Sequence, residues 1–254
     1  MTYFLYDGSF EGLLTSIFEV YEYKLDKVSI CKISTYEKGF FNKEIEVITQ
    51  QEKSTRLQKG IIKMGSALDF SQIYRAFLSE LNGVEDLILN YTQYLFTEKR
   101  SVAKDYANKY VLEISQIVKK IGREKHRMDA FVRFRLTKDN IYFATVAPDF
   151  NVLPLNEAHF RKRYADQKWC IYDLKRNYGI FYDLHKTEII SLDLPTNILS
   201  SSEEFFKPEE LHFQQLWKNY FKSATISSRI NKKLHQQHVP IRYWKYLSEK
   251  YLQV

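Results

Sequence analysis

The chain contains few residues that interrupt regular structure. Its 254 residues include only 8 Gly and 5 Pro, against 19 Tyr and 18 Phe, and 44% of the sequence is hydrophobic. This composition excludes a collagen-like or linker-dominated protein, and its apolar content is too high for intrinsic disorder. We therefore expect a compact, aromatic-rich protein with a core of ordinary size.

Cysteine and long apolar runs are also scarce. Cys31 and Cys170 lie far apart, each in a predicted strand, so the sequence offers neither a disulfide framework nor a CxxC motif, and we expect two buried thiols. No segment approaches the roughly 20 apolar residues of a membrane-spanning helix, and the N-terminus lacks the pattern of a secretion signal. We expect a cytoplasmic protein with no membrane partner.

The familiar catalytic motifs are absent. The sequence contains no GxGxxG, GxxxxGK[ST], HExxH or GxSxG pattern, and it lacks the HxE and PCxxC motifs of zinc deaminases. His235 and His238 are three residues apart, but no third ligand is near them in the sequence. We therefore expect no metal site and no cofactor.

Acidic residues are outnumbered only in the second half of the chain. Residues 119–254 hold 24 Lys and Arg against 15 Asp and Glu, whereas residues 1–118 hold 14 against 16. If the basic segments meet on one surface, they would attract a phosphate backbone in a salt-sensitive way; the alternative is scattered, solvated side chains. The three basic segments are residues 119–138, 161–186 and 207–254.

The periodicity of apolar residues predicts strands followed by a helical block. An amphipathic helix is expected from Phe10, after the potential capping residues Asp7 and Ser9. About four further helices are expected in residues 51–126, separated near Gly65, Asn82 and Arg100. The expected strands are residues 2–6, 27–34 and 44–49.

After His126 the side-chain pattern changes from the helical period to a period of two residues, which is typical of a β-strand. Residues 131–136 and 141–148 are expected to form a hairpin, with Arg133 and Arg135 on one face of a strand. The remaining expected elements are a helix over 156–166, strands at 169–174 and 179–184, an irregular connection over 193–208, helices at 209–222 and 242–251, and an irregular segment over 225–240.

This order of elements favours an α+β fold over a doubly wound sheet, because strands and helices do not alternate regularly. We expect a mixed or antiparallel sheet with a helical block inserted after the first strands and a helical C-terminal tail. The expected substructures are residues 1–50, 51–126 and 127–192 and a basic, aromatic tail over 193–254.

Aromatic and basic side chains alternate in the second half, as in sites for single strands or flipped bases. Rings stack on bases and guanidinium groups pair with phosphates, but for each ring taken singly a place in the core is the favoured interpretation. Arg133 and Arg135 could instead pair across strands with a carboxylate such as Asp139 or Asp149. The candidate nucleic-acid contacts are Arg127, Arg133, Arg135, Arg163, Trp169, Arg176, Arg229, Lys232 and Arg242.

Catalysis would require acid–base groups that meet in one pocket. The candidates are Asp7, His126, His159 and Asp173.

Three parts of the sequence carry a family resemblance: YDGSFEGLLTSIFEVYE at the start, EKHRMDAFVRF through KWCIYD in the centre, and LWKNYFKSATISSRINKKLHQQHVPIRYWKYL near the end. They resemble the bacterial family of probable DNA-metabolism proteins, which contains the domain of unknown function 4130. The resemblance extends over essentially the whole chain and implies a single domain, residues 1–254.

The resemblance implies a role in DNA repair or modification, beside a radical-SAM protein or a uracil-DNA glycosylase-like domain. It supplies no established catalytic residues. The chain itself has no clustered cysteines of a radical-SAM enzyme, so we expect an accessory protein that binds DNA, a partner protein, or both. The alternatives are an enzyme acting on a nucleobase or nucleotide, and a protein adaptor that does not touch nucleic acid.

Overall fold

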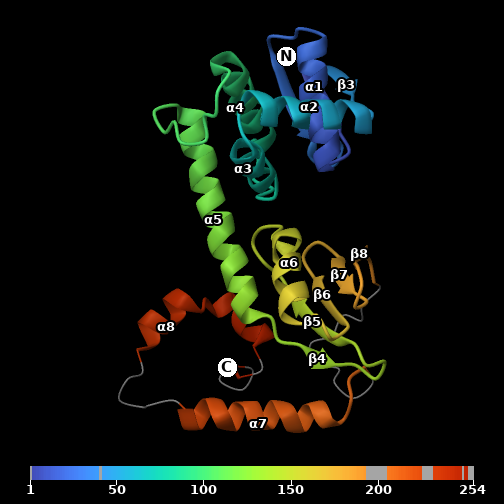
Figure 1. Ribbon diagram of the computed structural model, residues 1–254, viewed down its shortest axis with the longest axis vertical. Coiled ribbons are helices and arrows are strands. Elements are labelled where there is room, and N and C mark those ends of the chain that lie inside the picture. Colours follow the sequence, from blue (N-terminus) through green and yellow to red (C-terminus); the bar gives the residue numbers. More distant parts are fainter. Residues whose placement is uncertain (1, 40–41, 193–204, 225–230, 248, 251–254) are drawn as a thin grey trace. The chain divides into compact units, whose positions relative to one another are not determined.

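The computed structural model describes residues 2–39, 42–192, 205–224, 231–247 and 249–250 (Figure 1). It divides into two compact units, Met1–Gly122 and Arg123–Val254, which are described separately below. Both contain helices and a sheet, which confirms the predicted α+β class. None of the helices in the described ranges is both long and apolar enough to cross a membrane.

The first unit contains a small parallel sheet. Strand β1 (Thr2–Tyr6) lies between β2 (Val28–Lys32) and β3 (Lys43–Glu46), and both neighbours run parallel to it. Helix α1 (Phe10–Glu22) follows β1, and the hydroxyl of Ser9 caps it by accepting a hydrogen bond from the Gly12 amide. The three predicted strands and the capped helix are therefore confirmed, although β2 ends at Lys32 and β3 at Glu46, before the predicted ends at residues 34 and 49.

Four helices follow this sheet, as the sequence predicts. They separate at Gly65, at Gly83, whose φ of +78° lies in the left-handed region that favours glycine, and after Glu98. The helices are α2 (Gln51–Met64), α3 (Ala67–Phe77), α4 (Val84–Glu98) and α5 (Lys109–Phe131).

A buried carboxylate stabilises this helical block. Asp69, on α3, accepts hydrogen bonds from the hydroxyls of Ser66, Ser101 and Tyr91 and from the Val102 amide. Burial alone would raise the pKa of Asp69, but the hydrogen bonds from these groups outweigh burial and lower it. The carboxylate therefore joins α3 to α4 and to the loop that follows α4.

The second unit contains a five-stranded mixed sheet. Its order is β4-β5-β6-β7-β8, and only the β5–β6 pair is parallel. Helix α6 (Leu153–Arg163) connects these two parallel strands. The strands are β4 (Arg135–Leu136), β5 (Tyr142–Val146), β6 (Trp169–Asp173), β7 (Tyr178–Tyr182) and β8 (Thr187–Ile190).

The described C-terminal elements are α7 (Glu209–Ala224), α8 (Lys232–His238) and the 3₁₀ helix η3 (Ile241–Tyr246). Tyr243 of η3 is buried, and its ring lies 5.4 Å from that of Phe131. The end of the chain therefore contributes to the core of the second unit.

Several predicted boundaries were wrong. Helix α5 continues through Phe131 because Met128 and Phe131 both contribute apolar contacts at helical spacing, so Arg133 precedes the short strand β4 and does not share a strand face with Arg135.

Further differences concern the C-terminal half. Strand β8 was not predicted, α6 begins three residues before its predicted start, and the segment 225–240, predicted to be irregular, contains α8. The last predicted helix is the shorter η3. Of the predicted connection over 193–208, residues 193–204 lie outside the described residues.

Candidate nucleic-acid interface

The parallel strands β5 and β6 end at the same edge of the second sheet. Val146, the last residue of β5, lies opposite Asp173, the last residue of β6. The loop 147–152 leaves β5 at this edge, and the turn 174–177 leaves β6. Because ligands bind outside the carboxyl ends of parallel strands in many open α/β sheets, polar groups here are the first candidates for function.

Side chains from distant parts of the chain converge on Asp149 in the first of these loops. The carboxylate of Asp149 pairs with Arg242 of η3 at 2.7 Å, and its carbonyl accepts hydrogen bonds from Lys175 and Arg176 at 3.0 and 3.2 Å. Its amide donates to Glu124 of α5 at 2.9 Å. We call this group the Asp149 cluster; it comprises Glu124, Arg127, Asp149, Asp173, Lys175, Arg176 and Arg242.

Glu124 is the buried centre of the cluster. Its carboxylate accepts hydrogen bonds from the hydroxyl of Tyr243, from Arg127 at 3.4 Å and from Arg242 at 3.3 Å. A buried carboxylate is stable only when it is paired and hydrogen-bonded, and these groups satisfy that requirement. Burial, and next the neighbouring Glu124, raise the pKa of Tyr243, so its hydroxyl remains a donor at neutral pH.

Asp173 and Arg176 form a second pair in the cluster, in which Asp173 is fully buried and Arg176 nearly so. Their ion pair measures 2.8 Å, and Asp173 also accepts hydrogen bonds from the amides of Lys175 and Arg176. The Arg176 guanidinium also donates to the carbonyl of Pro148. This pair therefore fixes the turn after β6 against the loop after β5.

The accessible side of the cluster is formed by different groups. The side chains of Arg242 and Asp149 are 42% and 50% exposed, and Arg127 is partly exposed. Lys175 is also at the surface. These groups, and not the enclosed Asp173, are the ones that can meet a ligand.

The Asp149 cluster contains residues from all three basic segments of the sequence. Arg127 comes from the first basic segment, Lys175 and Arg176 from the second, and Arg242 from the third. All three segments therefore meet at one edge of the sheet, where four cations face three carboxylates.

The other arginines proposed for nucleic acid lie elsewhere in the second unit. Arg133 pairs with Glu249 at 2.8 Å and not with the suggested Asp139 or Asp149. The guanidinium of Arg135 lies 3.7 Å from the centre of the Phe206 ring. Arg163 is exposed on the last turn of α6, beside Tyr164.

Trp169 is buried in the core, where its ring contacts those of Phe160 and Tyr182, so it is not open to stacking by a base. Arg229 lies outside the described residues, as does the side chain of Lys232.

The catalytic candidates are divided between the two units, and those of the second unit do not form one group. In the first unit, the Asp7 carboxylate accepts hydrogen bonds from Ser9 and Thr49 and organises the loop before α1. In the second unit, His126 is exposed on α5 and His159 contacts the Phe160 ring. Among the described contacts, neither of these two imidazoles is hydrogen-bonded to Asp173. The Asp173 carboxylate instead pairs with Arg176 and accepts hydrogen bonds from amides of the turn. Among the described residues, no three His, Cys, Asp or Glu side chains are grouped to hold a metal ion.

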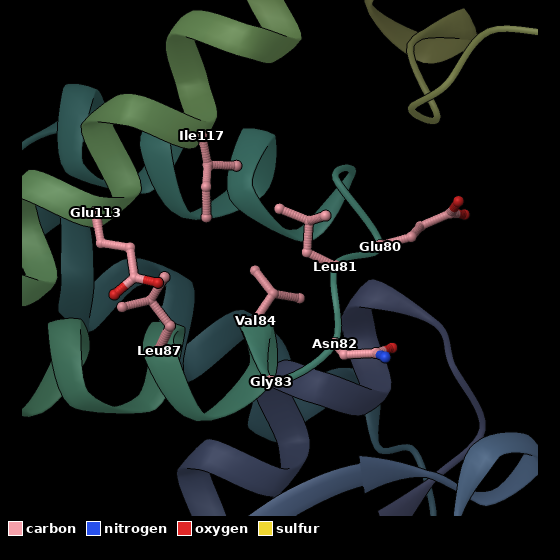
Figure 2. A pocket seen from close by; sticks show the side chains of 8 residues that line it. All are labelled: Glu80, Leu81, Asn82, Gly83, Val84, Leu87, Glu113 and Ile117. Atoms are coloured by element: carbon pink, nitrogen blue, oxygen red, sulfur yellow. The ribbon is translucent and has the colours of Figure 1, made fainter.

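A pocket in the first unit was not predicted from the sequence. It measures about 510 Å³ and lies beside the Asn82-Gly83 turn. Figure 2 shows Val84 and Ile117 along its apolar wall, Glu113 beside Leu87, and Glu80 pointing away. Its charged lining residues are acidic, so it does not suit a phosphate. The lining residues are Glu80, Leu81, Asn82, Gly83, Val84, Leu87, Glu113 and Ile117.

The second unit thus defines an α+β protein with a cluster of cations and carboxylates at the carboxyl edge of its one described parallel strand pair. The family model for the domain of unknown function DUF4130 matches residues 82–249, and the chain belongs to this family. The match is narrower than the predicted resemblance, but it includes the whole Asp149 cluster. No curated protein matches the chain.

Proposed function

We propose that this chain is an accessory protein of DNA repair or modification, and that it binds nucleic acid through the Asp149 cluster. The observation that carries the proposal is the meeting of all three basic segments at one edge of the second sheet. In the Asp149 cluster four cations outnumber three carboxylates, which leaves a local surplus of one positive charge.

The exposed cations have the chemistry that phosphate binding requires. Arg242 already binds an anionic oxygen of Asp149, and a phosphate oxygen carries the same kind of acceptor. A backbone phosphate would exchange with Asp149, whose side chain is half exposed, while Glu124 stays buried and keeps Arg242 oriented. Lys175 adds an exposed positive charge beside them, held by its hydrogen bond to the Asp149 carbonyl.

The family context supplies the biological setting of the proposal. The resemblance to probable DNA-metabolism proteins suggests action beside a radical-SAM protein or a uracil-DNA glycosylase-like domain. With two cysteines in all, the chain cannot supply a three-cysteine iron–sulfur motif of its own. We therefore assign it a binding role beside such enzymes.

A second candidate function is a protein adaptor that does not touch nucleic acid. It is favoured by the exposed apolar side chains on α7, which would suit a protein groove. The enzyme alternative has less support, because the described acid–base candidates of the second unit are not joined.

The test is binding of labelled single-stranded and double-stranded DNA across a salt series. We expect affinity to fall steeply with salt, and the variants Arg242→Gln and Lys175→Gln each to reduce the logarithmic salt slope by about one. Lys38→Gln is the matched control, because Lys38 is an exposed lysine of the first unit. Absence of binding to either DNA at low salt would overturn the proposal, and an adaptor would instead show salt-independent binding to a protein alone.

A further inference from the structure

Helix α7 has an apolar face that no described part of the chain covers completely. Phe213 and Tyr220 are 60% and 63% exposed, and Leu216 and Trp217 between them are also exposed. Their spacing of three, four and seven residues places all four side chains on one side of the helix. A contiguous apolar face of this kind marks a binding surface more often than a solvated one.

The helix that carries this face is held at two points. The carboxylate of Glu210, in its first turn, accepts a hydrogen bond from the Leu136 amide of β4 at 2.8 Å. In its middle, Trp217 donates from its indole nitrogen to Glu249 at 3.0 Å, and Glu249 pairs with Arg133. These contacts fix one edge of the Trp217 indole and leave the ring partly exposed.

The exposed rings are arranged as a stack. The ring centres of Trp217 and Tyr220 lie 5.7 Å apart, with 27° between their planes. The guanidinium of Arg133 lies 6.0 Å from the centre of the Trp217 ring. Adjacent aromatic faces beside a cation are what unpaired bases use for binding, because every base has a face that can stack.

Charge decides between a nucleic acid and a protein as the occupant of this face. The charges within α7 balance, since it contains two Glu and two Lys, but residues 207–254 as a whole contain nine Lys and Arg against three Asp and Glu, so the segment that includes α7 attracts a polyanion. In a duplex, the base faces are covered by their neighbours. Single-stranded nucleic acid therefore matches both the rings and the charge.

We infer that the α7 face, formed by Phe213, Leu216, Trp217 and Tyr220, binds the unpaired bases of single-stranded nucleic acid by stacking. The inference rests on the proposed function, since it specifies which form of nucleic acid the protein binds. It adds a contact to bases that the Asp149 cluster, with its phosphate chemistry, does not provide.

The test compares Tyr220→Leu with Tyr220→Phe. Leucine keeps an apolar side chain but removes the ring, whereas phenylalanine keeps the ring, so only a stacking site separates the two variants. Using fluorescence anisotropy with oligothymidylate, we expect Tyr220→Leu to weaken binding about tenfold and Tyr220→Phe to bind as the wild type. Tyr106→Leu, at an exposed tyrosine of the first unit, is the matched control.

The outcomes separate this inference from the proposed function. If Tyr220→Leu binds the single strand as tightly as Tyr220→Phe while binding stays salt-dependent, stacking on α7 is refuted and the phosphate site stands. The inference is also refuted if Tyr220→Leu weakens binding to a hairpin-free duplex as much as it weakens binding to the single strand, because stacking requires unpaired bases. Absence of binding to any strand at low salt removes both proposals. An oligouridylate arm that responds to Tyr220→Leu in the same way supports stacking in RNA as well as DNA.

Discussion

The hydroxyl of Tyr243 donates a hydrogen bond to the buried carboxylate of Glu124, a residue 119 positions earlier in the sequence. This bond, together with Arg242, attaches η3 to the last part of α5. It is one of the contacts through which the end of the chain completes the second unit.

Tyr243→Phe removes this donor and keeps the ring against Phe131. A buried carboxylate that loses a partner costs about 1–3 kcal/mol, so we expect the free energy of unfolding to fall by about that amount. Urea denaturation measures the change, and Tyr246→Phe, on the same 3₁₀ helix, is the control. Equal stability of Tyr243→Phe and the wild type would show that Glu124 does not depend on this hydroxyl.

Asp69→Asn tests the centre of the helical block. The folded-state pKa of Asp69 is lowered, so its stabilisation is complete above the ordinary pKa of about 4 and is lost as the pH falls through the lower folded-state value. We expect Asp69→Asn to destabilise the protein at pH 7 by about 1–3 kcal/mol and to flatten the loss of stability in acid. Unfolding curves from pH 7 to pH 2 measure both effects, with the exposed Asp139→Asn as control. An unchanged acid profile would contradict the role of Asp69.

The surroundings of His235 predict a separate loss of stability in mild acid. Burial, and next the charge of Lys250, lower its pKa, and its buried Nε2 atom has no hydrogen-bond partner among the described residues. The unfolded chain therefore binds the proton more tightly, and stability is lost as the pH falls below about 6.5, the ordinary value for histidine.

Thermal unfolding at pH 7.5 and 5.5 measures this effect. We expect the wild type to lose more stability between these values than His235→Gln does, whereas the exposed His185→Gln should behave as the wild type. The same pH response in the wild type and His235→Gln would assign the effect to another group.

The two cysteines should react differently with a thiol reagent. Burial raises the pKa of Cys170 to about 12 and also raises that of Cys31, which is only partly buried. Because the thiolate is the reactive form, we expect Cys170 to react with Ellman's reagent at pH 8 only after unfolding, and Cys31 to react slowly in the folded protein. The single variants Cys31→Ser and Cys170→Ser show which thiol is responsible for each phase of the labelling reaction. Rapid labelling of Cys170 in the native protein would contradict its place in the core.

Local patterns predicted the helices and strands better than they predicted the site. The stripe that begins at Phe10 and the breaks at Gly65 and Gly83 depend on residues close in sequence, so their periodicity could be read directly. The alternation from Phe131 to Leu136 was misleading, because the same residues also continue the helical spacing of α5.

The Asp149 cluster could be anticipated only as a possibility. Its arginines stood out as basic residues, but the sequence does not reveal that Arg242 shares Glu124 with Arg127. The roles of Asp149 and Tyr243 depend on contacts across about a hundred residues. Composition also did not distinguish Trp169, which is enclosed, from Trp217, which is exposed.

The late position of Tyr243 in the sequence affects the order of folding during synthesis. Until residues 242 and 243 have emerged from the ribosome, Glu124 lacks two of its hydrogen-bond donors, although α5 and the strands of the second unit are already available. The first unit does not depend on these residues for its buried carboxylate at Asp69. We therefore expect the first unit to become protease-resistant on the ribosome before the second, which should do so only after residues 242 and 243 have emerged.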